Sequence, residues 1–198
     1  MQIKYLAIKL VIIYYSICFF NVFALPVLNY SNGSMSFISK DSKGYLKIKI
    51  KNAYSLLYLD NGLDNNYVPD GISLIGEIKD VALIFIDSYP SRTVSKSGYC
   101  GAGNEVFLRV ISIKEKIPKE AYKIKIASCF DSIELQNENS SDAQLLSIGA
   151  FDYSKNSIIF NKNNNKISIN WGYNPKKENT STTILSVDRD CKVTREDK

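Results

Sequence analysis

Residues 97–105 read Ser-Gly-Tyr-Cys-Gly-Ala-Gly-Asn-Glu and lead into the apolar run Val-Phe-Leu-Arg-Val-Ile at 106–111. Three glycines around one cysteine, between two apolar runs, favour a backbone geometry that residues with a Cβ resist. Residues 105–113 and 121–129 have the pattern of two hairpin arms, turning at 116–119. In that hairpin Cys129 lies opposite about Asn104. We therefore expect the glycine-rich corner to fold Cys100 back into a disulfide with Cys129.

Alternating and continuous apolar patterns around this corner predict further strands. Residues 45–51 alternate strictly, with three aliphatic side chains on one face and lysines on the other. This pattern is typical of an antiparallel strand with one wet face, and a lysine row also suits the edge of a sheet. Residues 81–86 are apolar at every position, so we expect this strand to be buried on both faces. Residues 157–160 and 166–171 flank three asparagines and predict a hairpin.

The remaining chain also favours strands over helices. Residues 35–40, 72–78, 133–135 and 182–187 have strand patterns, and 87–103 has the composition of a long polar loop. Residues 53–63 fit either a strand or a short helix, and 145–151 fit either a strand or one helical turn. We predict an all-β, mostly antiparallel domain with at most one or two short helices. A sandwich is favoured over a closed barrel.

The N-terminus has the features of a secretory signal peptide. Lys4 and Lys9 precede an apolar run at 10–20, which ends at Val-Phe-Ala before a predicted cleavage after Ala24. The apolar run is short for a bilayer span, so an uncleaved anchor is the weaker alternative. We predict a signal peptide at 1–24 and a single exported β domain at 25–198, without stable membrane insertion after cleavage. The periplasm is the favoured compartment, with secretion or the cell surface as alternatives.

The composition excludes several chemistries. The chain has no histidine, which removes Ser-His-Asp and Cys-His catalysis and most zinc sites. A net charge of +5 with interspersed signs is too weak to argue for a nucleic acid partner. A carboxylate pair drawn from Asp80, Asp87 and Glu105 remains a candidate for hydrolysis. Positions at the ends of strands explain these acids better, so we expect no catalytic residue, no metal and no cofactor.

Aromatic and basic side chains supply candidate binding residues. Trp171 ends a predicted strand and Tyr173 lies in the predicted loop after it; Trp171 is either a binding anchor or, more simply, part of the core. Tyr89, Arg92, Lys96 and Tyr99 belong to the predicted long loop, which is suited to protein recognition or merely exposed.

The glycine-rich corner carries a resemblance to a known group of proteins. The stretch at 97–105, the apolar strand after it and the later Ser128-Cys129 resemble small exported bacterial proteins of unknown function. Those proteins share a Gly-Tyr-Cys-Gly-Ala-Gly-x-Glu stretch and a later Ser-Cys, and the likeness covers residues 97–135. It implies the Cys100–Cys129 pairing and bacterial export, but no activity. Structural roles are expected for Gly98, Gly101, Gly103 and Glu105.

Three functional hypotheses follow. The first is a non-enzymatic periplasmic protein that binds another protein, such as a toxin or an enzyme, as an inhibitor or immunity-type protein. The second is a surface-associated structural or adhesive module, in which Cys191 or an exposed edge strand joins chains. The third is a carboxylate-dependent hydrolase.

Overall fold

The computed structural model describes residues 27–40, 43–60, 69–91, 103–115, 117–136, 145–148, 151–173 and 181–198. These residues form fifteen strands and no helix, and all strand pairs are antiparallel, as predicted. Within these ranges, accordingly, no helix has the length and apolarity needed to cross a membrane. The predicted signal peptide at 1–24 lies outside the described residues.

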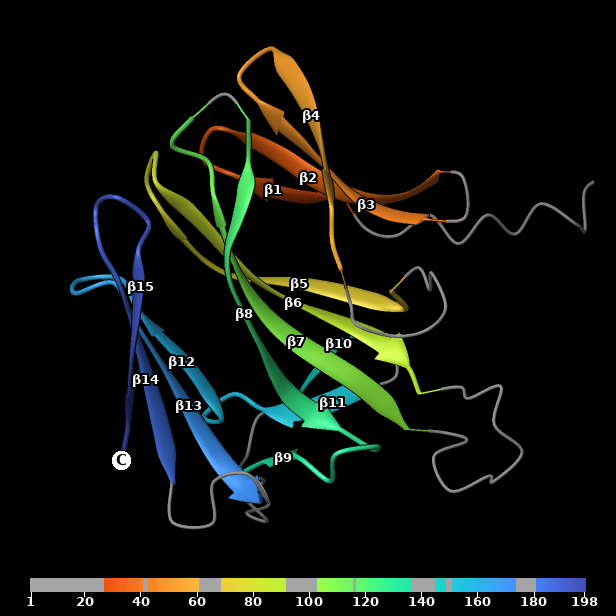
Figure 1. Ribbon diagram of the computed structural model, residues 1–198, viewed down its shortest axis with the longest axis vertical. Helices are drawn as coiled ribbons and strands as arrows, with labels where there is room; N and C mark the ends of the chain where they lie inside the picture. The colour runs from red at the N-terminus through yellow and green to blue at the C-terminus, as the bar shows by residue number, and fades with distance from the viewer. Residues whose placement is uncertain are drawn as a thin grey trace, which may run out of the picture.

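A four-stranded sheet lies at the centre of the molecule (Figure 1). It consists of β5 (Gly71–Ile78), β6 (Ala82–Pro90), β7 (Asn104–Ser112) and β8 (Lys119–Ser128), in chain order. Every residue of β6 from Ala82 to Tyr89 is buried, which confirms the prediction of a strand covered on both faces. β7 and β8 form the hairpin expected on either side of residues 116–119.

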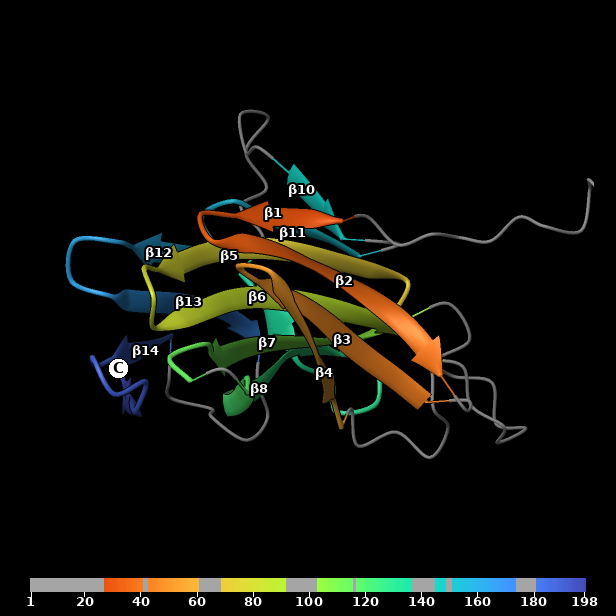
Figure 2. The same ribbon diagram turned by 90° about the horizontal axis from the view of Figure 1, so that it is seen from above.

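A second sheet covers one face of the central sheet (Figure 2). It consists of β1 (Leu28–Tyr30), β2 (Gly33–Lys40), β3 (Lys43–Ile50) and β4 (Ala53–Tyr58), again in chain order. Its inward side chains, Met35, Phe37, Leu46 and Ile48 among them, pack with Leu83, Phe85 and Ile111 of the central sheet. The lysines of β3 point to the other side, as the alternation predicts.

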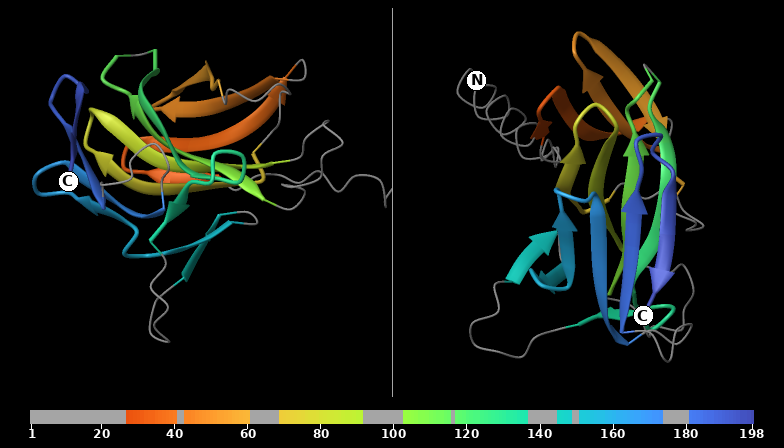
Figure 3. Two further views of the ribbon diagram at one scale, coloured as in Figure 1. Left: turned by 60° about the horizontal axis from the view of Figure 1, so that its bottom comes forward. Right: turned by 90° about the vertical axis from the view of Figure 1, so that its left-hand side faces the viewer.

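The third layer covers the opposite face of the central sheet (Figure 3). It contains β12 (Ile158–Asn161), β13 (Lys166–Tyr173), β14 (Thr182–Val187) and β15 (Val193–Asp197), with β9 (Glu134–Leu135) paired to β13. The hairpin of β10 (Leu145–Ile148) and β11 (Phe151–Ser154) lies beside it. A larger core fills the space between these strands and the central sheet. Asn165 in the β12–β13 turn has a φ of 53°, as the asparagine-rich turn predicts.

Some local predictions need correction. Residues 28–30 and 193–197, for which the sequence pattern predicts no strand, form β1 and β15. β6 continues to Pro90, so Asp87 and Tyr89 lie in a strand and not in the predicted loop. The lysine-bearing strand β3 lies between β2 and β4, so it is an inner strand, and the edges of this sheet are β1 and β4. Of the two segments for which a strand and a helix were both possible, residues 53–58 and 145–148 are strands, so the strand alternative is confirmed in each.

Candidate functional site

The first candidate cluster is a buried ion pair between β6 and β7. The Arg109 Nε donates to both carboxylate oxygens of Asp87, at 2.9 and 2.8 Å, and neither side chain is exposed. Tyr89 donates its hydroxyl to Asp87 at 2.6 Å. Arg109 Nη1 donates to Glu120 at 2.5 Å and to the carbonyl oxygen of Asp60 at 3.1 Å. Asp87 is therefore the buried counter-ion of Arg109.

Burial and charge act together on the pKa values of this cluster. Burial, the largest single influence, lowers the pKa of the Arg109 guanidinium, but Asp87, Tyr89 and Glu120 together raise it more, and the net pKa lies above the ordinary value. Burial, followed by the negative charge of Asp87, raises the pKa of Tyr89 well above its ordinary range. Arg109 is therefore charged and Tyr89 neutral at any physiological pH.

Glu105, near the start of β7, forms a separate hydrogen-bond network. It is fully buried and accepts hydrogen bonds from Ser91 Oγ at 3.1 Å, Ser128 Oγ at 2.7 Å and the Phe130 amide at 3.2 Å. Lys125 Nζ lies 2.9 Å from the same carboxylate and 2.6 Å from that of Asp131. Burial lowers the pKa of Lys125, but its bonds to these two acids raise it above the ordinary value overall. Glu105 thus fixes the turn after β8.

Asp80, the third carboxylate of the hydrolase hypothesis, lies in the exposed β5–β6 turn. It has a φ of 60° and accepts a hydrogen bond from Asn32 Nδ2 at 2.6 Å. The three acids therefore engage in separate contacts. They do not line a shared cleft in the part of the chain that the structure describes.

The glycine-rich corner is described only from Gly103 onward. A Cβ at Gly103 would lie 2.6 Å from Cys129 Cβ and 2.9 Å from its Sγ, so this position has no room for a side chain. Cys129 is disulfide-bonded, and Cys191 is buried with a free thiol. Gly98, Cys100 and Gly101 lie outside the described residues, and the pairing of Cys100 with Cys129 stays a prediction.

The predicted binding residues have different positions. Tyr89 is buried in the cluster above, and Trp171 is buried in the larger core, where its Nε1 donates to Thr183 Oγ1 at 2.9 Å. Trp171 thus occupies the core position that was the simpler alternative. Tyr173 ends β13, and its side chain is not described. Arg92, Lys96 and Tyr99 lie outside the described residues.

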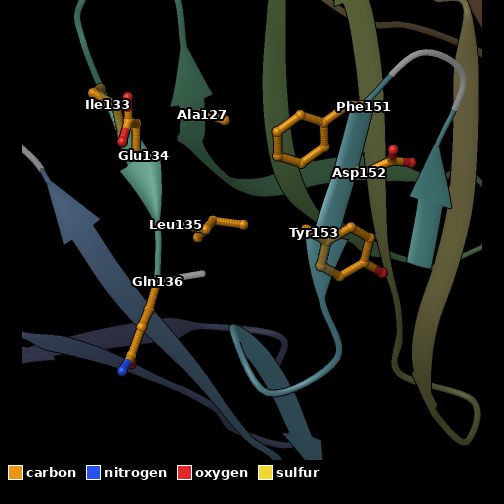
Figure 4. Close-up of a pocket in the computed structure, with 8 residues that line it drawn as sticks. All are labelled: Ala127, Ile133, Glu134, Leu135, Gln136, Phe151, Asp152 and Tyr153. Carbon is orange, nitrogen blue, oxygen red and sulfur yellow. The ribbon is translucent and has the colours of Figure 1, made fainter. Parts of the chain in front are cut away.

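The pockets lined by described residues include the following two. One of about 180 Å³ lies between β9 and β11, with Leu135 on one wall and Phe151 and Tyr153 on the other (Figure 4). Burial raises the pKa of Tyr153 above its ordinary value. The other pocket, about 560 Å³, lies beside the Lys114–Asp190 ion pair and the buried Cys191. Neither pocket gathers a set of groups that specifies a reaction.

The most distinctive exposed feature is the outer side of β3 and β4. Its members are aromatic, aliphatic or basic side chains that alternate with the inward core residues, and we call them the lysine–tyrosine face: Lys43, Lys47, Lys49, Tyr54, Leu56 and Tyr58. Tyr54, Leu56 and Tyr58 are 60, 48 and 46% exposed. Lys47 Nζ lies 4.4 Å from the centre of the Tyr54 ring, and the Tyr45 and Tyr58 rings are 5.7 Å apart.

Sequence reasoning missed this face because the segment at 53–63 was ambiguous. A signal was nevertheless present, since Tyr54, Leu56 and Tyr58 stand at alternate positions directly after the lysine-bearing strand. Two alternating strands joined by a two-residue turn predict a hairpin, and a hairpin places these three side chains beside the lysines. No protein family, no curated protein and no solved structure matches the chain.

Proposed function

We propose that the protein is an exported, non-enzymatic binding protein that acts by contact with another protein. The observation that carries this proposal is the exposure of Tyr54, Leu56 and Tyr58 together on one strand. Contiguous exposed apolar side chains are uncommon on monomeric proteins, and tyrosine is enriched at the centres of protein interfaces. An inhibitor or immunity-type protein, directed against a toxin or an enzyme, is the specific form that we favour.

The state of the cysteines supports export. Cys129 is disulfide-bonded and Cys191 is free, and disulfides persist in oxidising compartments. Gly103 contacts Cys129 directly and stands three residues after Cys100, so a Cys100–Cys129 bond needs only a short return of the chain. Together with the predicted signal peptide, this pairing supports a periplasmic location.

A structural or adhesive module is the second candidate. The uncharged edge strand β4 favours it, because such an edge can join chains by strand pairing. Cys191 gives it less support than expected, since the thiol is buried. The carboxylate-dependent hydrolase is the weakest candidate, because Asp87 and Glu105 are already engaged by buried partners.

The test is affinity capture with the protein produced through its own secretory route. Envelope and secreted extract from its source would be passed over the wild type and over the variant Tyr54→Ser/Leu56→Ser/Tyr58→Ser. The control Ile117→Ser/Phe130→Ser/Ile159→Ser removes three exposed apolar side chains elsewhere on the surface. We expect the wild type and the control to retain one soluble protein in a 1:1 complex by native mass spectrometry, and the face variant to lose it.

Circular dichroism establishes that all three proteins are folded. Recovery of nothing but further copies of the protein, or of wall and membrane fragments, would contradict the proposal and favour the structural module. Equal retention of the partner by the face variant would move the binding site away from β4.

A further inference from the structure

The edge of the β1–β4 sheet lacks the usual protection against strand pairing. Among the described strands β4 pairs only with β3, and the six residue pairs between them run without a bulge. Its sequence, Ala-Tyr-Ser-Leu-Leu-Tyr, contains no charge and no proline. Natural edge strands are usually protected by lysine, proline or a bulge, and an unprotected regular edge accepts an added strand.

The positive charge of the protein is concentrated on the same sheet. Residues 28–59 contain five lysines and one aspartate, a net charge of +4, whereas residues 60–198 contain 18 basic and 19 acidic side chains, a net charge of −1. The sheet therefore has a positive potential that the remaining domain does not share. Such asymmetry steers association with a negatively charged surface.

The lysines of β3 extend toward the outer edge of β4. Lys47 and Lys49 place their ammonium groups 4.4 and 5.7 Å from the Tyr54 ring centre, and Lys43 lies 5.9 Å from that of Tyr58. Both rings belong to β4, so the charges lie over the edge strand although the lysines come from β3. Neighbouring strands are about 4.8 Å apart, so alternate side chains of an added strand would come within reach of these ammonium groups.

We propose that the partner docks through an extended acidic segment that pairs with the outer edge of β4, which no described strand occupies, as a fifth strand of the sheet. Main-chain hydrogen bonds to β4 supply the register, and carboxylates at alternate positions of the segment meet Lys43, Lys47 and Lys49. Tyr54, Leu56 and Tyr58 contact the apolar portions of the same side chains. This inference rests on the proposed function and names the chemistry of its partner.

Charge also selects against a second copy of this chain as the occupant. Pairing of β4 with another β4 would bring a second set of lysines to the same face and would supply no carboxylate from the described strands of that sheet. An acidic segment of a different protein satisfies both the edge and the lysines.

The test uses a fluorescent peptide, Thr-Glu-Val-Glu-Val-Glu-Val-Thr, and the secreted, disulfide-bonded protein. Two matched peptides serve as controls. The first carries lysine in place of each glutamate, and the second carries N-methylated amides at alternate positions, which prevent strand pairing. By fluorescence anisotropy we expect saturable binding of the glutamate peptide and about tenfold or weaker binding of both matched peptides. Lys47→Glu/Lys49→Glu is expected to reverse the preference toward the lysine peptide. The control Lys162→Glu/Lys166→Glu, on the β12–β13 hairpin, is expected to leave it unchanged.

Absence of binding by the glutamate peptide would overturn the inference, as would equal binding of the lysine or N-methylated peptide. Dimerisation of the protein through β4 would overturn it in favour of a second copy. The capture experiment separates this inference from the proposed function. If the captured partner is lost from the Tyr54→Ser/Leu56→Ser/Tyr58→Ser variant but still binds the Lys47→Glu/Lys49→Glu variant, the proposed function stands and the acidic strand is rejected.

Discussion

Among the residues that the structure describes, Arg109 is one of the largest fully buried side chains. In the sequence it interrupts an otherwise apolar run, and nothing adjacent to it in the chain supplies a counter-charge. Its partner Asp87 comes from the neighbouring strand, 22 residues earlier, and Glu120 comes from the strand on the other side. A buried guanidinium is tolerated only with such partners, because loss of one partner of a buried pair costs about 3–5 kcal/mol. The contacts of Arg109 with Asp87 and Glu120 therefore hold β6, β7 and β8 in one register.

Tyr89 permits a prediction about pH at the scale of a single hydroxyl. Tyr89→Phe removes the hydrogen bond to Asp87, so we expect a loss of about 1–3 kcal/mol in the free energy of unfolding at pH 8. The pKa of Tyr89 is raised in the folded protein, so above about pH 10 only the unfolded state ionises this residue. Above about pH 10 the free energy of unfolding of the wild type therefore falls by about 1.4 kcal/mol per pH unit from this residue alone.

The measurement is urea unfolding of both proteins at pH 8 and pH 10.7. We expect the difference in free energy of unfolding between wild type and variant to be smaller at the higher pH. The other tyrosines are common to both proteins and cancel in the difference, so an unchanged or wider gap would contradict the buried, neutral Tyr89.

At the scale of elements, Gly76 sets how closely β5 approaches β12. A Cβ at Gly76 would lie 2.1 Å from Cδ1 of the Phe160 ring and 2.9 Å from its Cγ, too close for the ring to remain in place. We expect Gly76→Ala to lower the free energy of unfolding by about 1–3 kcal/mol, because the two layers must separate or the ring must rotate. In the background of Phe160→Leu the same substitution is expected to cost about 1 kcal/mol less, since the smaller side chain can move aside. Chemical denaturation of the four proteins of this cycle measures the coupling, and strictly additive effects would contradict the close contact.

The elements also show how far the sequence predicts this fold. Alternation with period 2 predicts β3 and β8, whose lysines alternate with aliphatic side chains, whereas a continuous apolar run predicts β7, which is buried on both faces. The same pattern cannot tell an edge strand from an inner one, since this depends on which strand pairs next. The lysines of β3 were therefore assigned to an edge that β4 in fact provides. β6 was predicted too short because Asp87 and Ser88 resemble loop residues, and only the fold brings their hydrogen-bond partners Arg109 and Asn104 beside them.

At the scale of the whole molecule, two hydrophobic cores lie on opposite faces of one central sheet. Residues of β6 alternate between them: Leu83 and Phe85 belong to the smaller core, whereas Ile84 and Ile86 belong to the larger one. The lysine–tyrosine face lies on the outer side of the β1–β4 sheet, whose inner side packs on the smaller core. Binding at β4 is thus connected to the rest of the domain through a single shared layer.

This shared layer predicts that the two cores unfold as one unit. Trp171 is the only tryptophan of the chain and lies in the larger core, so its fluorescence reports on that core alone. Ile48→Ala truncates a fully buried side chain of the smaller core and is expected to lower the free energy of unfolding by about 2–5 kcal/mol. Because β6 carries both cores, we expect the Trp171 transition to shift to lower urea by the same amount as the far-ultraviolet circular dichroism transition. Leu185→Ala, in the larger core, is the matched control and is expected to shift both signals together as well. A Trp171 transition that Ile48→Ala leaves in place, while the circular dichroism signal splits into two steps, would instead show that the β1–β4 sheet unfolds on its own.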